Sequence, residues 1–72
     1  MMTVMIKMNT GKVIARGEVF DDEWKGQDSK DMISRILNRS NQQIIVLNHE
    51  SEYNEIINTD DIESWEFRGN AY

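Results

Sequence analysis

Cysteine is absent from the 72 residues of this sequence, and His49 is its single histidine. A chain without cysteine forms no disulfide, and one imidazole is too few for the usual structural zinc sites. The absence of cysteine also favours a location inside the cell, where disulfides are rare. We therefore expect a cytoplasmic domain with no metal site and no cofactor.

Long apolar runs are absent too, since the longest has four residues, Ile44–Leu47. A helix that spans a membrane needs about 20 such residues. Residues 1–8 also lack the basic and apolar regions of a signal peptide. The sequence therefore predicts no association with a membrane.

Signatures of catalysis and of phosphate binding are missing as well. The four glycines are scattered and form no phosphate-binding loop, and no serine lies in a nucleophile-elbow pattern. A calcium loop counted from Asp21 has Gly26 in the right place, but Lys25 and Met32 occupy positions that need an oxygen ligand. We therefore expect no enzymatic activity, no catalytic residue and no metal ligand.

Basic residues are outnumbered, eight against thirteen acids, and the net charge is −5. The imbalance is concentrated in residues 49–72, which hold seven acids and the single base Arg68. Such a segment repels nucleic acid and suits a partner with a basic surface. The simpler alternative is that the charge keeps a small protein soluble.

The first twenty residues predict a β-hairpin. Thr3–Met8 alternates apolar and polar residues, Asn9–Lys12 is a turn in which Gly11 takes a positive φ, and Lys12–Phe20 returns. Gly17 is expected to mark a bulge or bend in the second strand. The predicted faces of that strand are Val13, Ala15 and Val19 on one side and Ile14, Arg16, Glu18 and Phe20 on the other.

One helix and three further strands follow. Ser29–Arg39 carries an apolar stripe at helical spacing, and Asn41 is suited to a left-handed residue after it. The unbroken apolar run in the next strand predicts that both of its faces are covered. The helical stripe is Met32, Ile33, Ile36 and Leu37, and the strands are Gln43–Asn48, Tyr53–Asn58 and Ser64–Arg68, with a helix-like turn at Thr59–Ile62.

The order of elements is two strands, one helix and three strands. It predicts an α+β fold: a five-stranded antiparallel sheet, curled or forming an open barrel, with one short helix against it. Residues 1–68 form the single domain and 69–72 a tail. A chain of this size has a core worth only about 3–5 kcal/mol, and without disulfides or metal, self-association is the remaining aid. We therefore expect a homo-oligomer.

The predicted binding surface has two parts. Trp24 lies in a charged segment, and an exposed Trp with an acidic rim is typical of interface hot spots. The equal alternative is that it covers the open end of the sheet. The acids of the last third form the second part. The predicted partner-binding residues are Asp21, Asp22, Glu23, Trp24, Glu50, Glu52, Glu55, Asp60 and Asp61.

Two other functions stay open. The first is a small barrel that binds single-stranded nucleic acid through the basic residues Arg16, Arg35 and Arg39, although the thirteen acids oppose this. The other is an oligomer that binds a small ligand between its subunits.

The segments MIKMNTGKVI and IINTDDIESWEF resemble those of short accessory proteins of phages and prophages of Gram-positive bacteria. Both are β-hairpin segments, and together they cover about half of the chain. The resemblance implies a protein that binds and disables a host or defence protein. We therefore expect a non-enzymatic protein-binding module, an accessory or inhibitor protein that acts through its acidic surface and self-association.

Overall fold

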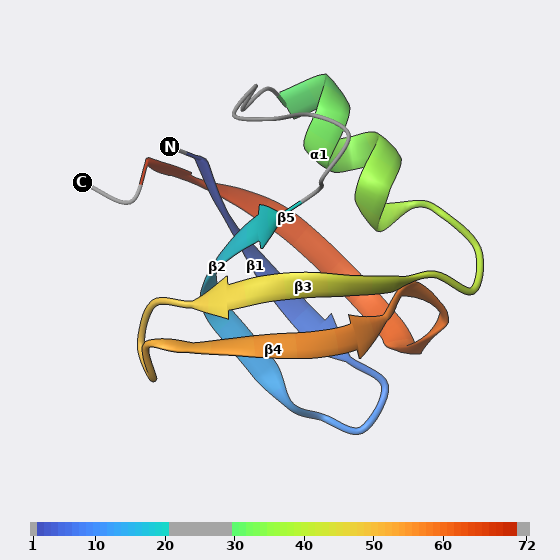
Figure 1. Ribbon diagram of the computed structural model, residues 1–72, viewed down its shortest axis with the longest axis horizontal. Coiled ribbons are helices and arrows are strands. Elements are labelled where there is room, and N and C mark those ends of the chain that lie inside the picture. Colours follow the sequence, from blue (N-terminus) through green and yellow to red (C-terminus); the bar gives the residue numbers. More distant parts are fainter. Residues whose placement is uncertain (1, 21–29, 71–72) are drawn as a thin grey trace.

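Two β-hairpins and a last strand form one five-stranded antiparallel sheet, and a single helix packs against it (Figure 1). The computed structural model describes residues 2–20 and 30–70. The predicted α+β fold and the predicted order of elements are confirmed. The elements are β1 (Met2–Met8), β2 (Val13–Phe20), α1 (Lys30–Leu37), β3 (Gln43–Asn48), β4 (Tyr53–Asn58), the 3₁₀ turn η1 (Thr59–Asp61) and β5 (Ile62–Asn70).

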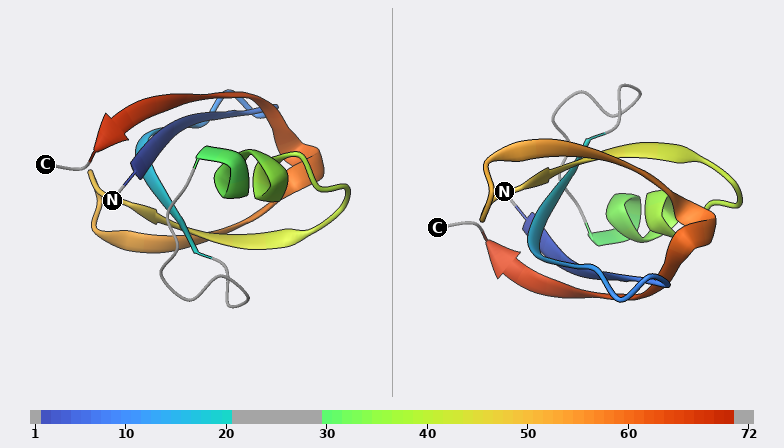
Figure 2. Two further views of the ribbon diagram at one scale, coloured as in Figure 1. Left: turned by 90° about the horizontal axis from the view of Figure 1, so that it is seen from above. Right: turned by 90° about the horizontal axis from the view of Figure 1, so that it is seen from below.

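The sheet is strongly curled. Its strand order is β4-β3-β2-β1-β5, so the two strands that follow one another in the chain, β4 and β5, lie at opposite edges. The three residues of η1 join them, and so short a link requires the edges to approach one another. Figure 2 shows the two halves, β1 with β5 and β3 with β4, facing each other with α1 between them. The predicted curled sheet is confirmed, and it does not close.

The core fills the inside of this curl. All four residues of the predicted stripe on α1 are buried, and so are the alternate residues of β1. Burial of this stripe is what holds so short a helix, because an isolated helix of eight residues is unstable in water. No helix in the described part of the chain is long and apolar enough to cross a membrane. The buried apolar residues are Val4, Ile6, Met8, Ile14, Met32, Ile33, Ile36, Leu37, Ile44 and Val46.

β2 contains a bulge that changes which residues face the core. Val4 pairs with Gly17 and Ile6 with Ile14, so two steps along β1 oppose three along β2. Ile14 is fully buried and Val13 is 49% exposed, whereas Val19 beyond the bulge packs against the core. The predicted faces, with Val13 and Val19 together, are therefore wrong, because one extra residue shifts the alternation.

β3 is covered on one face only. Ile44 and Val46 point into the core, but Ile45 between them is 43% exposed. The prediction that both faces are covered is wrong. The curl of the sheet and α1 bury the inner face, and the outer face of β3 meets solvent.

The last strand is longer than the sequence predicts. β5 runs to Asn70 because Gly69 and Asn70 pair with Thr3 and Met2 of β1. The predicted end of the last strand at Arg68 is therefore wrong by two residues. The local sequence of residues 69–70 carries no strand signal, and only pairing with a strand more than sixty residues away makes them part of the sheet.

Candidate protein-interaction surface

Three large apolar side chains lie next to one another on the outer face of the sheet. Phe20 of β2 pairs with Ile45 of β3, and Ile45 pairs with Ile56 of β4. Directly paired residues share a face. The exposed fractions are 45% for Phe20, 43% for Ile45 and 69% for Ile56. We call these three residues the apolar row.

The row ends at an open edge of the sheet. Among the described residues, β4 pairs only with β3. Thr59 N donates to Gln42 O at 2.8 Å, one step beyond the end of the strands. In an antiparallel ladder alternate residues bond to the same neighbour. Ile57, Glu55 and Tyr53 therefore bond towards β3. The N–H and C=O of Asn54 and Ile56 and the N–H of Asn58 point to the open edge, whereas the carbonyl of Asn58 begins η1 as its N-cap.

Ile56 belongs to both features. Its side chain is the exposed end of the apolar row, and its N–H and C=O lie at the middle of the open edge. Its pairing with Ile45 is of the non-hydrogen-bonded type, in which the two side chains approach most closely. β4 thus offers apolar surface and backbone hydrogen bonds at one place.

The predicted acids of the last third lie at the two ends of β4 and do not form one patch. Glu50 and Glu52 occupy the turn before the strand, and Asp60 and Asp61 lie in η1 after it. All four are exposed. Figure 1 shows the two turns at opposite ends of β4. A strand of six residues is about 20 Å long, so the two acidic pairs flank the strand at this separation.

Asp60 also holds its own turn together. Its Oδ1 accepts a hydrogen bond from Asn41 N at 2.9 Å, and its backbone N donates to Asn58 Oδ1 at 2.9 Å. Asn9 N donates to the carbonyl of Asp61 at 2.8 Å. The backbone of η1 is therefore tied to the first hairpin and to the segment before β3, and the carboxylate of Asp60 is held in place.

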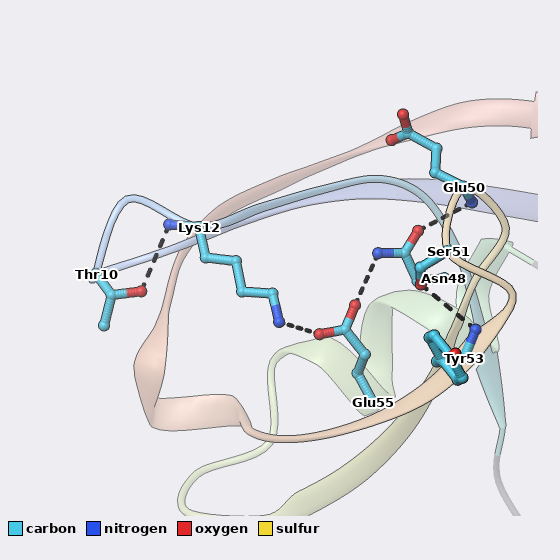
Figure 3. A network of polar contacts seen from close by, with 7 residues as sticks. All are labelled: Thr10, Lys12, Asn48, Glu50, Ser51, Tyr53 and Glu55. Carbon is cyan, nitrogen blue, oxygen red and sulfur yellow. Dashed lines mark hydrogen bonds and ion pairs between the residues drawn. The ribbon is translucent and has the colours of Figure 1, made fainter.

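Glu55 differs from the four exposed acids because its side chain is largely buried and forms an ion pair. Lys12, in the turn just before β2, donates to Glu55 Oε1, and Asn48 Nδ2 donates to Oε2 at 2.7 Å (Figure 3). The side chain of Glu55 is only 16% exposed. These two donors, Lys12 first and then Asn48, hold the pKa of the Glu55 carboxyl below its usual value of 4.5. Glu55 thus links β4 to β3 and to the first hairpin.

Four of the predicted partner-binding residues, Asp21, Asp22, Glu23 and Trp24, lie outside the described residues. The two interpretations of Trp24, as an interface anchor or as a cover for the sheet, both stay predictions.

The three arginines of the nucleic-acid alternative do not lie in one group. Arg16 O accepts from His49 N at the end of β3, whereas Arg39 precedes the start of β3. The strand between these two points spans about 17 Å. Arg35 forms an ion pair of 3.2 Å with Asp31 on α1. The backbone positions of Arg16 and Arg39 are too far apart for a single compact basic patch.

His49 is half-buried, and its Nε2 lies 3.1 Å from Glu18 Oε1. This contact joins the β3–β4 turn to β2. In the part of the chain that the structure covers, no group of three or more His, Asp or Glu residues could hold a metal ion.

An open groove of about 560 Å³ lies between the end of α1 and the start of β5. Its wall mixes the cation of Arg39 with the carboxylates of Asp60 and Glu63, and Trp65 adds an aromatic surface. This mixture selects no single ligand charge. The groove is built within one chain, whereas the small-ligand alternative needs a site between subunits.

The apolar row was not among the residues selected from the sequence. The signal for it was the unbroken run Ile44–Leu47, because a strand covered on one face must then expose Ile45. Local sequence could not show that Phe20 and Ile56 lie beside Ile45, since that follows from the pairing of three strands.

Comparisons with protein-family models, curated proteins and solved structures found no match. The surface is therefore interpreted from its own geometry.

Proposed function

We propose that this protein is a non-enzymatic binding module that contacts another protein through the outer face of β2, β3 and β4. The observation that carries the proposal is the apolar row Phe20, Ile45 and Ile56, which runs across three paired strands and ends at an open edge. Single exposed apolar residues are common on protein surfaces. A contiguous group that reaches an open edge is typical of an interaction surface.

The charges near the row favour a basic partner. The exposed acids Glu50, Glu52, Asp60 and Asp61 lie at both ends of β4, and the molecule carries a net charge of −5. Acids at the border of an apolar surface speed the approach of a basic partner and disfavour acidic ones. The surface therefore combines an apolar centre with an acidic border.

The sequence resemblance adds a biological setting to this proposal. An accessory protein of a phage or prophage that disables a host protein needs a binding surface and no catalytic residues. The proposed function includes this role, with a host or defence protein as the partner.

The experiment that tests the proposal compares matched variants in a pull-down from bacterial lysate, with both protein and nucleic acid assayed. The double variant Ile45→Thr/Ile56→Thr keeps β-branched residues on the strands but removes apolar area from the row. We expect it to capture its partner at least about tenfold more weakly than wild type, the loss of an interface hot spot. Val13→Thr is the control, because Val13 is 49% exposed, close to Ile45, but lies outside the row.

Equal capture by wild type and the double variant would show that the row is not the binding surface. Recovery of nucleic acid that is lost as salt is raised would support the nucleic-acid alternative instead.

A further inference from the structure

We propose that the open edge of β4 binds an extended segment of the partner as an additional antiparallel strand, and that this segment is apolar in its middle and basic at both ends. The inference rests on the proposed function and names the chemistry of the partner. It follows from three properties of β4: its outward backbone groups, the side chain of Ile56 and the acids at its two ends.

The backbone of β4 supplies the hydrogen bonds. The N–H and C=O groups of Asn54 and Ile56 and the N–H of Asn58 point to the open edge, as the ladder with β3 requires. An extended segment that pairs with them adds a sixth strand to the sheet. Binding by strand addition draws its affinity from such main-chain bonds and its specificity from alternate side chains.

The side chains next to this edge specify an apolar middle. Ile56 is 69% exposed on the outer face, with Ile45 directly beside it. A β-branched or aromatic side chain on the same face of the added strand would cover Ile56 from its open side, as in other cross-strand pairs, while Ile45 covers it from the other side. Glu55, the acid in the middle of β4, is already paired with Lys12, so this part of the edge requires no charge on the partner.

The ends of β4 specify basic flanks and disfavour a second copy of this chain. Glu50 and Glu52 lie before the strand and Asp60 and Asp61 after it. Antiparallel pairing of two β4 strands would bring the first acidic pair of one copy beside the second pair of the other. Parallel pairing would place identical acids together. Both arrangements oppose like charges, whereas Lys or Arg residues about 20 Å apart on a partner strand would meet opposite charge at each end.

The other open edge of the sheet is less suited to this role. Among the described residues β5 pairs only with β1, and its exposed residues include Glu63, Glu66 and Arg68, with Glu63 in an ion pair with Lys7. Charged side chains of both signs along an edge discourage strand addition. β5 therefore serves as the internal control.

The probe is a synthetic peptide with blocked ends, Lys-Lys-Thr-Val-Thr-Ile-Thr-Val-Lys-Lys, titrated into ¹⁵N-labelled protein and followed by NMR. We expect saturable shifts centred on Asn54, Ile56 and Asn58, with slower hydrogen exchange of these three amides. The same peptide with glutamates in place of its lysines, and one with prolines in place of its central threonines, should bind at least tenfold more weakly.

Two variants locate the contact. Asn54→Pro removes an outward N–H without touching the ladder with β3, and edge strands tolerate proline at such positions. It should abolish the shifts. Glu52→Lys/Asp61→Lys should weaken peptide binding about tenfold, since two exposed ion pairs are lost. The matched control Glu63→Lys/Glu66→Lys makes the same change of net charge on β5 and should bind the peptide more tightly than the β4 variant.

Peptide-induced shifts on β5, no shifts at all, or equal peptide binding by Asn54→Pro would overturn strand addition. Shifts of the β4 amides when the protein alone is diluted would overturn it too, because they would show a second copy of the chain at this edge. If Asn54→Pro does not fold, hydrogen exchange in the wild-type protein still decides. Capture of the cellular partner by the same variants distinguishes a failure of this inference from a failure of the proposed function. Capture lost in Ile45→Thr/Ile56→Thr but kept in Asn54→Pro would leave the binding surface in place and remove strand addition, whereas capture kept in both would remove the surface itself.

Discussion

Among the residues that the structure describes, two have a left-handed backbone without being glycine. Asn41, after α1, has φ 50°, and Glu52, at the end of the β3–β4 turn, has φ 63°. Asparagine accepts this conformation at small cost, and its position after the helix was predicted from the sequence. Glutamate accepts it less readily, because its Cβ crowds the following carbonyl. Both turns require a left-handed residue, and asparagine adopts this conformation at lower cost than glutamate.

Replacement of Glu52 by asparagine should stabilise the protein. Glu52→Asn relieves the cost of the left-handed conformation and is expected to raise the free energy of unfolding by about 0.5–1 kcal/mol. Chemical denaturation measures this, with Glu50→Asn as control for the charge change in the same turn. The same gain in both variants would assign the effect to charge and not to the backbone.

β2 bends at Gly17, and the bend depends on the missing side chain. A Cβ built on Gly17 would lie 2.7 Å from Cγ1 of Val46 and 3.1 Å from Cγ2 of Ile14. Both neighbours are fully buried and β-branched, so neither can move away easily. β2 can approach β3 this closely only with glycine at this position.

The variant Gly17→Ala should therefore lose stability, by about 1–3 kcal/mol for an overpacked core. A double-mutant cycle with Val46→Ala tests the cause, because removal of Cγ1 makes room for the new methyl group. We expect the double variant to be more stable than the sum of the two single losses predicts. Additive losses in the denaturation midpoints would mean that contact with Val46 is not the reason.

The helix and most strands could largely be predicted from the sequence, but the pairing of the strands with one another could not. The bounds of β3 and β4, the stripe on α1 and the positive φ of Gly11 all agree with the predictions, because periodicity and turn residues are local signals. The bulge beside Gly17 was predicted, but the faces of β2 were mispredicted, because only pairing with β1 shows where the alternation shifts. The end of β5 was mispredicted because pairing with β1, and not its own residues, extends it.

The candidate surface shows the same division. The acids at the ends of β4 were selected from the sequence, but as one surface together with Glu55, and the structure instead separates them by the length of a strand. The apolar row was missed because Phe20 and Ile56 are 36 positions apart in the sequence and meet only through β3. Composition identified the charge of the surface, and topology identified its centre.

At the scale of the whole molecule, one ion pair spans the open side of the curled sheet. Lys12 of the first hairpin reaches Glu55 of β4, and Asn48 supports the same carboxylate from β3 (Figure 3). The ladder between β2 and β3 covers only Gly17–Phe20, so near Lys12 the first hairpin and β4 are joined through side chains. We expect Lys12→Met to reduce the free energy of unfolding by about 0.5–1 kcal/mol, and Lys7→Met, from an exposed pair with Glu63, to reduce it less.

This ion pair also makes stability depend on pH. The pKa of Glu55 is lower in the folded protein than the usual 4.5. Such a group stabilises the fold fully above the unfolded-state pKa, and the contribution is lost as the pH falls through the folded-state pKa. Glu55→Gln does not titrate, so below about pH 4.5 wild type should lose more stability than this variant. Parallel curves of unfolding free energy against pH would contradict the assignment.

The pairing of β1 with β5 determines when the chain can fold. Met2 and Thr3 pair with Asn70 and Gly69, so one side of β1 has no neighbour until residues 62–70 have left the ribosome. During synthesis the nascent chain holds the apolar residues of β1 next to an unsatisfied strand edge, the state in which small β proteins aggregate or meet chaperones. β1 therefore completes its pairing only after residues 62–70 have been made, and the yield of folded protein in a cell should depend on how fast β5 then joins β1.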